Sequence, residues 1–337
     1  MYIDRIKLYQ DLEKRLDSVL LVYITGDRQG FETQINEDVI DIFINHLDRI
    51  GITKKLSLYL YTRGGNIASA WNIVNLIKQY CEVLQVIVPH KAHSAGTLIS
   101  IGANSIIMTK QATLGPIDPS LNTPLNPPVP GALPQNTYPV SVEAVKGYIA
   151  FAKEELAIKD DMALSNIMIR LSENVHPLVL GQVYRLRAQI KMLAEKLLVT
   201  QVPDTAKMQQ IISFLCSDSG SHDYTINRRE AKNGLGLNVE KPDEEMYMVI
   251  KKIYDSISEE LGFGIPFDLS ALARSDTGEY DIKRALIESI SGGSSYNHVN
   301  GKVTFINLQQ QPNAPPQQAI QHEIIFEGWE HESNNSE

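Results

Sequence analysis

Val88-Pro89-His90-Lys91-Ala92-His93-Ser94-Ala95-Gly96-Thr97-Leu98-Ile99 joins an apolar run to a segment of small residues that is compatible with a helix. The run that leads into it, residues 83–88, is typical of a buried strand. Ser94 is therefore predicted to lie where a strand ends and a helix begins. The free N–H groups of a first helical turn can stabilise negative charge that develops beside such a hydroxyl. From these residues alone two interpretations stay open: a nucleophilic serine, or small residues that let a helix pack closely on a sheet.

A second connection of this kind lies upstream. Residues 56–61 are predicted to form a strand, which Thr62-Arg63-Gly64-Gly65-Asn66 connects to an amphipathic helix over about 67–80. Paired glycines can adopt backbone angles that are closed to other residues, and they let a peptide N–H approach a ligand with no side chain in the way. We predict that Gly65 and Ala95 donate their N–H groups to one oxyanion, although a Gly-Gly pair alone usually marks only a tight connection.

Strands and helices alternate along the first third of the chain. Apolar strands are predicted at 18–24 and 105–108, and a helix with one apolar face is predicted at 37–50. Together with the two connections above, this alternation predicts an α/β fold with a parallel sheet covered by helices.

Four motifs follow one another along the chain: Thr62-Arg63-Gly64-Gly65, His93-Ser94-Ala95-Gly96-Thr97-Leu98-Ile99, Leu114-Gly115-Pro116-Ile117-Asp118-Pro119, and Ser221-His222-Asp223-Tyr224 with Glu230-Ala231 and Gly236-Leu237-Asn238-Val239. In this order they resemble the serine dehydrogenase proteinase family, which belongs with the Clp protease catalytic subunit and signal peptide peptidase A in the Clp/crotonase fold. The resemblance covers roughly residues 19–240. It implies a Clp/crotonase-like core and a serine peptidase in which Ser94 attacks the peptide carbonyl.

The resemblance also implies three candidates for the remaining catalytic groups. His222 lies in the region that carries the third triad member in Clp protease, and imidazole suits proton transfer near neutral pH. Lys146 lies 52 residues after Ser94. In signal peptide peptidases the general base is a lysine several tens of residues downstream of the serine, but such a base needs a desolvated amine. Asp118 stands at or beside the place of the Clp catalytic histidine. The alternatives are a histidine bonded to a backbone carbonyl, a surface lysine and a turn aspartate; we rank His222 before Lys146 as the base.

The pattern of elements predicts four parts. They are a helical arm at 1–18, a peptidase domain at 19–242 whose helical part is about 141–216, a helix and strand-pair module at 243–308, and a disordered tail at 309–337. The arm is expected to pack either on a neighbouring subunit or on its own domain. Eight of the 16 prolines lie between Pro116 and Pro139, which predicts a surface loop that acts as a substrate rim or is disordered.

Composition narrows the range of partners. The net charge of −9 argues against a nucleic-acid partner, which requires a basic surface. The two cysteines, Cys81 and Cys216, are expected to be buried thiols rather than a disulfide or a metal site, and we expect no cofactor. No G-x-x-x-x-G-K-[ST] pattern occurs, so the predicted hydrolase is ATP-independent within this chain. Neither a signal peptide nor an integral membrane segment is expected, which predicts a cytoplasmic location.

The expected function is that of a serine endopeptidase acting on peptides or unfolded proteins. We expect a homo-oligomer, a trimer or higher, with a separate unfoldase for folded substrates. Two alternatives are a crotonase-like acyl-CoA enzyme, which uses paired N–H groups without a nucleophilic serine, and a catalytically inactive oligomeric scaffold.

Overall fold

The computed structural model describes residues 1–117, 120–131, 136–218, 223–275, 277–308 and 317–332. Contacts between residues divide the chain into two compact units. Unit 1 comprises Met1–Leu114 and Asn227–Glu337, and unit 2 comprises Gly115–Ile226. Each unit is described by itself.

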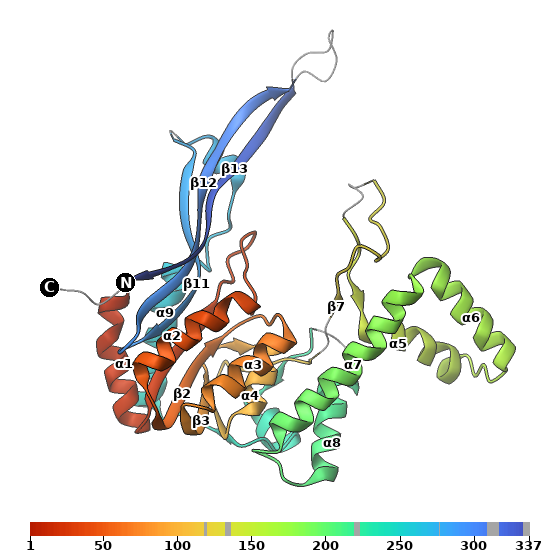
Figure 1. Ribbon diagram of the computed structural model, residues 1–337, viewed down its shortest axis with the longest axis horizontal. Coiled ribbons are helices and arrows are strands. Elements are labelled where there is room, and N and C mark those ends of the chain that lie inside the picture. Colours follow the sequence, from red (N-terminus) through yellow and green to blue (C-terminus); the bar gives the residue numbers. More distant parts are fainter. Residues whose placement is uncertain (118–119, 132–135, 219–222, 276, 309–316, 333–337) are drawn as a thin grey trace. The chain divides into compact units, whose positions relative to one another are not determined.

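Unit 1 is built on an eight-stranded sheet in the order β10-β5-β3-β2-β1-β11-β12-β13 (Figure 1). The first five strands of that order pair in parallel, and the last three join antiparallel to the edge that β1 would otherwise leave open. The predicted parallel core with helices is therefore confirmed, within a mixed sheet. The strands are β1 (Val19–Thr25), β2 (Thr53–Tyr61), β3 (Cys81–Val88), β5 (Ser105–Met108), β10 (Val239–Glu240), β11 (Glu279–Ser289), β12 (Gly293–Leu308) and β13 (Gln317–Glu332).

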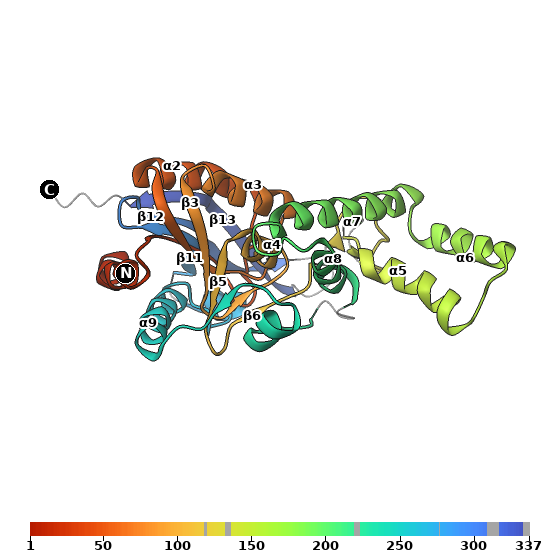
Figure 2. The same ribbon diagram turned by 90° about the horizontal axis from the view of Figure 1, so that it is seen from below.

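Helices cover both faces of this sheet (Figure 2). On β1, Leu20, Val22 and Ile24 belong to the core cluster formed with α1 and α9. Tyr23 points to the opposite face, where its ring meets the edge of Phe43 on α2 with 5.2 Å between ring centroids. Burial on both faces explains the uninterrupted apolar run of β1. The helices of unit 1 are α1 (Tyr2–Leu16), η1 (Glu37–Val39), α2 (Ile40–Ile50), α3 (Ile67–Ile77), α4 (Ala95–Gly102), η4 (Glu230–Gly234), α9 (Glu244–Glu260) and α10 (Leu269–Ala273).

The N-terminal helix packs on its own unit. Arg5 of α1 donates to Glu288 of β11 at 3.0 Å and forms a 2.6 Å ion pair with Glu260 of α9. Tyr9 is fully buried beside them and donates to Glu288. The sequence left open whether this helix reaches a neighbouring subunit, and these contacts fix α1 against its own sheet.

The C-terminal third continues the sheet. The sequence predicted a separate module at 243–308 and a disordered tail from 309, but α9 covers the core sheet and residues 317–332 form β13. β13 pairs with β12 from Ser294↔Glu332 to Leu308↔Gln317. The sequence indicated only Ile324-Ile325-Phe326 as a possible docking strand within the tail. Much of β13 is exposed, so polar residues surround that short apolar run and its full length did not read as a strand.

Unit 2 is mainly helical, as the sequence predicted. Ser141 caps α5, because its hydroxyl accepts a hydrogen bond of 3.1 Å from the Ala144 N–H. A small core forms around Val142 and Val179. The described part of the proline-rich segment contains no regular helix and pairs Pro128 with Thr137. The elements are β7 (Ser120–Leu121), β8 (Val140–Ser141), α5 (Val142–Ala150), η2 (Phe151–Glu155), α6 (Asp161–Asn174), α7 (Pro177–Leu198), α8 (Thr205–Ser213) and η3 (Phe214–Asp218), with β9 (Ile226–Asn227) at the boundary.

Within the described ranges of both units, no helix combines the length and the apolar character needed to cross a membrane.

Candidate active site

Ser94 occupies a strained turn between a strand and a helix. β3 ends at Val88, the short β4 (Lys91–Ala92) follows, and α4 begins at Ala95. Ser94 immediately precedes that helix with φ 50° and ψ −112°. A positive φ is rare for a residue with a side chain and costs on the order of 1–3 kcal/mol, so the surrounding structure must hold it in place. The prediction that Ser94 lies between the end of a strand and the start of a helix is confirmed.

Gly64 lies directly against Ser94. Gly64 has φ 117°, and a Cβ atom there would lie 2.7 Å from Ser94 Cβ and 3.3 Å from Ser94 Oγ. The contact is fixed by backbone pairing: Thr62 N–H donates to Lys91 O, and His93 N–H donates to Thr62 O, both at 3.1 Å. Only glycine fits this approach, so the two connections that the sequence singled out meet at one place.

The Gly65 N–H is left available by the pairing of its neighbours. Ile35 N–H donates to Gly64 O at 2.8 Å. Because Gly64 C=O and Gly65 N–H belong to the same trans peptide, the N–H points away from Ile35. Within the described residues it has no acceptor. A Cβ at Gly65 would lie 2.2 Å from Ile35 O, so this position too requires glycine.

The Ala95 N–H is free for a different reason. Ser94 C=O accepts the Leu98 N–H of α4 at 3.1 Å and therefore points into the helix. The Ala95 N–H of the same peptide points the opposite way, out of the helix N-terminus, and it meets no acceptor in the part of the chain that the structure describes. The Gly64–Ser94 contact is thus accompanied by two donors, and a hydroxyl with N–H donors is what attack on a carbonyl needs.

A polar cluster that the sequence did not reveal holds β4, the short strand just before Ser94. Asp27, just after β1, accepts hydrogen bonds of 2.6 Å from both Lys91 Nζ and Tyr61 OH. Burial alone would raise the pKa of Asp27, but these hydrogen bonds hold that pKa below its usual range. The available signal was positional, because Asp27, Tyr61 and Lys91 all lie at the carboxyl ends of neighbouring parallel strands.

Of the three candidates for the remaining catalytic groups, the described residues include Lys146 alone. His222 and Asp118 lie outside the described residues. Lys146 is on α5 of unit 2, where its amine is 3.6 Å from the Glu143 carboxylate and its side chain is 42% exposed. His93, next to Ser94, directs Nε2 to Thr113 Oγ1 at 2.9 Å. The choice between His222 and Lys146 stays a prediction.

Across the described ranges, no three His, Cys, Asp or Glu side chains gather in a way that could hold a metal ion.

Two of the solved structures that align with the chain are the following. A membrane-bound stomatin-specific protease (1510-N) aligns with 16% identity and a TM-score of 0.39, over 74% of this chain and 89% of that one. ClpP1 from Listeria monocytogenes aligns with 12% identity and a TM-score of 0.36, over 72% of this chain and 99% of that one.

Two relatives come from Methanocaldococcus jannaschii. Uncharacterized protein MJ0137 is 31% identical over 199 residues, which are 59% of this chain and 58% of the relative. Uncharacterized protein MJ1495 is 38% identical over 66 residues, 20% of this chain and 23% of the relative. The chain therefore spans less than two thirds of either relative's length.

A family model for ClpP-like SDH-type serine proteinases matches residues 46–136. That range contains both the glycine pair and the serine segment. The recognition made from the motifs is confirmed: over residues 46–136 this chain carries the sequence pattern of the ClpP-like SDH-type serine proteinase family.

Proposed function

We propose that this protein is a serine peptidase that hydrolyses peptide bonds with Ser94 as its nucleophile. The observation that carries the proposal is the strained backbone of Ser94 at the start of α4, directly against Gly64. A close-packing role for small residues does not require a positive φ at a serine. A nucleophile on a sharp turn between strand and helix does, because the turn exposes its hydroxyl.

In the proposed reaction Ser94 Oγ attacks the carbonyl carbon of the scissile peptide. The Gly65 and Ala95 N–H groups hold the oxygen that becomes negative, and loss of one such donor typically costs about 10²–10³ in rate. His222, or in second place Lys146, takes the hydroxyl proton and returns it to the leaving amine, and Asp118 orients the base. Water then hydrolyses the acyl-enzyme.

We further propose that the substrates are peptides or unfolded proteins. The sequence contains no phosphate-binding loop that would supply ATP-driven unfolding. Folded substrates would then need a separate unfoldase. A cytoplasmic location and a homo-oligomeric state are parts of the same proposal.

A fluorophosphonate probe tests the nucleophile. We expect covalent labelling of the wild type and loss of both labelling and peptide hydrolysis in Ser94→Ala, because removing a nucleophile costs several orders of magnitude in rate. Ser165→Ala, which removes an exposed hydroxyl on α6, is the matched control and should keep both. Hydrolysis near the wild-type level in Ser94→Ala would end the peptidase assignment, and thioester turnover that survives in this variant would favour the crotonase-like alternative.

A further inference from the structure

A polar pocket opens beside the Gly64–Gly65 turn in unit 1. Its volume is about 440 Å³, and it lies between β1, residues 32–39 and the strands β11 to β13. Two of its lining residues connect it to the candidate active site. Ile35 is bonded to the backbone on both sides of Gly65, and Asn66 follows Gly65 in the chain.

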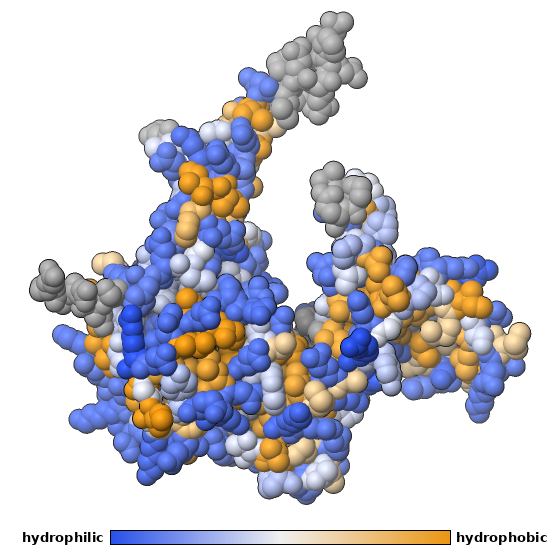
Figure 3. All heavy atoms as spheres, viewed as in Figure 1, coloured by the Kyte–Doolittle hydropathy of each residue, from blue (hydrophilic) through white to orange (hydrophobic). Residues whose placement is uncertain are grey.

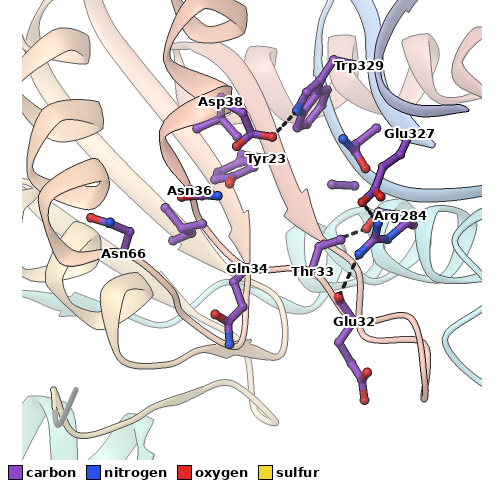
Figure 4. A pocket seen from close by; sticks show the side chains of 14 residues that line it. Tyr23, Glu32, Thr33, Gln34, Asn36, Asp38, Asn66, Arg284, Glu327 and Trp329 are labelled. Atoms are coloured by element: carbon purple, nitrogen blue, oxygen red, sulfur yellow. Dashed lines mark hydrogen bonds and ion pairs between the residues drawn. The ribbon is translucent and has the colours of Figure 1, made fainter. Parts of the chain in front are cut away.

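Most charges in the pocket are already paired. Arg284 forms an ion pair with Glu327 of β13 and also donates to the Glu32 carbonyl oxygen at 3.4 Å (Figure 4). The Glu32 carboxylate forms its own ion pair with Arg63 at 3.2 Å. Although the Arg284 Nε–H has no partner among the described residues, the Glu327 carboxylate cancels the charge on this wall.

Asp38 is the exception. Among the residues that the structure describes, no cationic group lies within 4.0 Å of its carboxylate. Its Oδ2 atom accepts a hydrogen bond of 2.8 Å from Trp329 Nε1, which orients the carboxylate without neutralising it. Figure 4 shows Asp38 together with Trp329 and Tyr23 at one end of the pocket.

The Tyr23 hydroxyl lacks a partner as well. Tyr23 lines the pocket, its side chain is 0% exposed, and its OH makes no hydrogen bond within the described part of the chain. Buried polar groups are nearly always hydrogen-bonded, so the unpaired hydroxyl in the pocket wall is a group to which a ligand can hydrogen-bond. Burial and the nearby Asp38 carboxylate raise the pKa of Tyr23, so the phenol stays neutral and can accept a hydrogen bond from a cation.

We propose that this pocket, the Asp38 pocket, binds the ammonium or guanidinium group of a lysine or arginine side chain in the peptide substrate. Asp38 supplies an unneutralised carboxylate, Tyr23 a hydroxyl oxygen and Trp329 an aromatic wall, a combination that suits a cation. A long side chain is needed, because Ile35 lines the pocket and the Gly65 N–H points away from Ile35. The inference rests on the proposed peptidase function and adds a substrate class to it.

Cleavage of a matched peptide series tests the proposal. The peptides carry an acetylated N-terminus, which removes the α-amine as a competing cation, and they differ at one position that holds arginine, lysine, citrulline or glutamate. We expect kcat/KM for arginine to exceed that for citrulline by about 10- to 100-fold at one position near the scissile bond, the range of a hydrogen-bonded charge. Asp38→Asn should bring this ratio close to one, and Tyr23→Phe should lower it several-fold.

Glu37→Gln is the matched control. It removes the same charge from the neighbouring residue of η1, which does not line the pocket, and should keep the preference for arginine. A preference that survives in Asp38→Asn, an equal loss in Glu37→Gln, or a preference for glutamate would each overturn the proposal.

A binding measurement separates this proposal from the peptidase assignment. Trp71 and Trp329 are the two tryptophans of the sequence, so the double variant Ser94→Ala, Trp71→Phe leaves Trp329 as the fluorophore in a protein that does not cleave. Titration with the arginine peptide should change its fluorescence at a concentration at least 10-fold lower than titration with the citrulline peptide. Equal affinities would overturn the Asp38 pocket, whereas absence of cleavage of every peptide by the wild type would count against the peptidase alone.

Discussion

A methyl group at position 64 would meet the proposed nucleophile. We expect Gly64→Ala to lose at least about 10²-fold in kcat, because the added Cβ would lie 2.7 Å from Ser94 Cβ and a displaced nucleophile no longer reaches the carbonyl. Gly51→Ala is the matched control. Gly51 also has a positive φ, 74°, and nothing lies within 4 Å of its added Cβ, so the variant carries backbone strain without the collision. Steady-state kinetics should show activity retained in Gly51→Ala, and equal losses in the two variants would contradict the argument.

Two single substitutions test which residue is the general base. We expect His222→Ala to lose most peptidase activity and Lys146→Ala to lose little, because Lys146 is 42% exposed and its amine is already ion-paired to Glu143. Initial rates on one peptide substrate measure this. The reverse result would establish a Ser/Lys dyad with Lys146 as the base.

Connections that depend on local chain geometry could be predicted from the sequence. Ser94 and Gly65 each lie between a strand and a helix, and the sequence pattern alone predicted both connections. Asp38 was not accessible, because its pocket is closed by Trp329, which is 291 positions away in the chain. No local pattern links such residues, and only the pairing of β11 to β13 brings them together.

At the scale of elements, α2 is joined to the antiparallel part of the sheet through His46. Its Nδ1 atom lies 2.9 Å from Ser289 Oγ on β11, and its Nε2 atom lies 3.0 Å from Ser295 Oγ on β12. Burial, together with the charges of His331 and Arg49, lowers the pKa of His46 from 6.5 to about 4. The neutral imidazole of His46 therefore helps to hold α2 against β11 and β12.

This shift predicts a pH dependence of stability. Between pH 6.5 and about 4 the unfolded chain binds a proton at His46 that the folded protein does not bind. The stabilisation is present above pH 6.5 and is lost as the pH falls towards 4, by up to roughly 3 kcal/mol for this shift. Urea unfolding at pH 7.5, 6 and 4.5 should show a smaller loss of stability in His46→Gln than in the wild type. Parallel pH profiles for the two proteins would show that His46 does not contribute.

The antiparallel strands also show where prediction of elements fails. The parallel strands are buried on both faces and read as apolar runs, so their positions were predicted closely. β13 is largely exposed, and its apolar residues Ile324 and Ile325 are 49% and 68% exposed. Such a strand forms because β12 offers it backbone hydrogen-bond partners. The amino-acid composition of β13 does not reveal this pairing.

At the scale of the whole molecule, unit 2 carries apolar surface that its own fold does not cover. No residue of α6 is buried, and its apolar side chains Met162 and Ile169 are 72% and 56% exposed. In Figure 3 apolar residues gather over the part of the chain that contains α5 and α6. Contiguous exposed apolar surface commonly marks a contact between proteins.

We expect this surface to join copies of the chain into a homo-oligomer of at least three subunits. Static light scattering at micromolar concentration should then give a mass of at least three times 37.7 kDa. Ile169→Glu should lower that mass, because it places a charge in an apolar contact. Asn174→Glu, which adds the same charge at an exposed polar position on another side of α6, is the matched control and should leave the mass unchanged. A wild-type monomer of 37.7 kDa with full peptidase activity would refute both the oligomer and the interface role of α6.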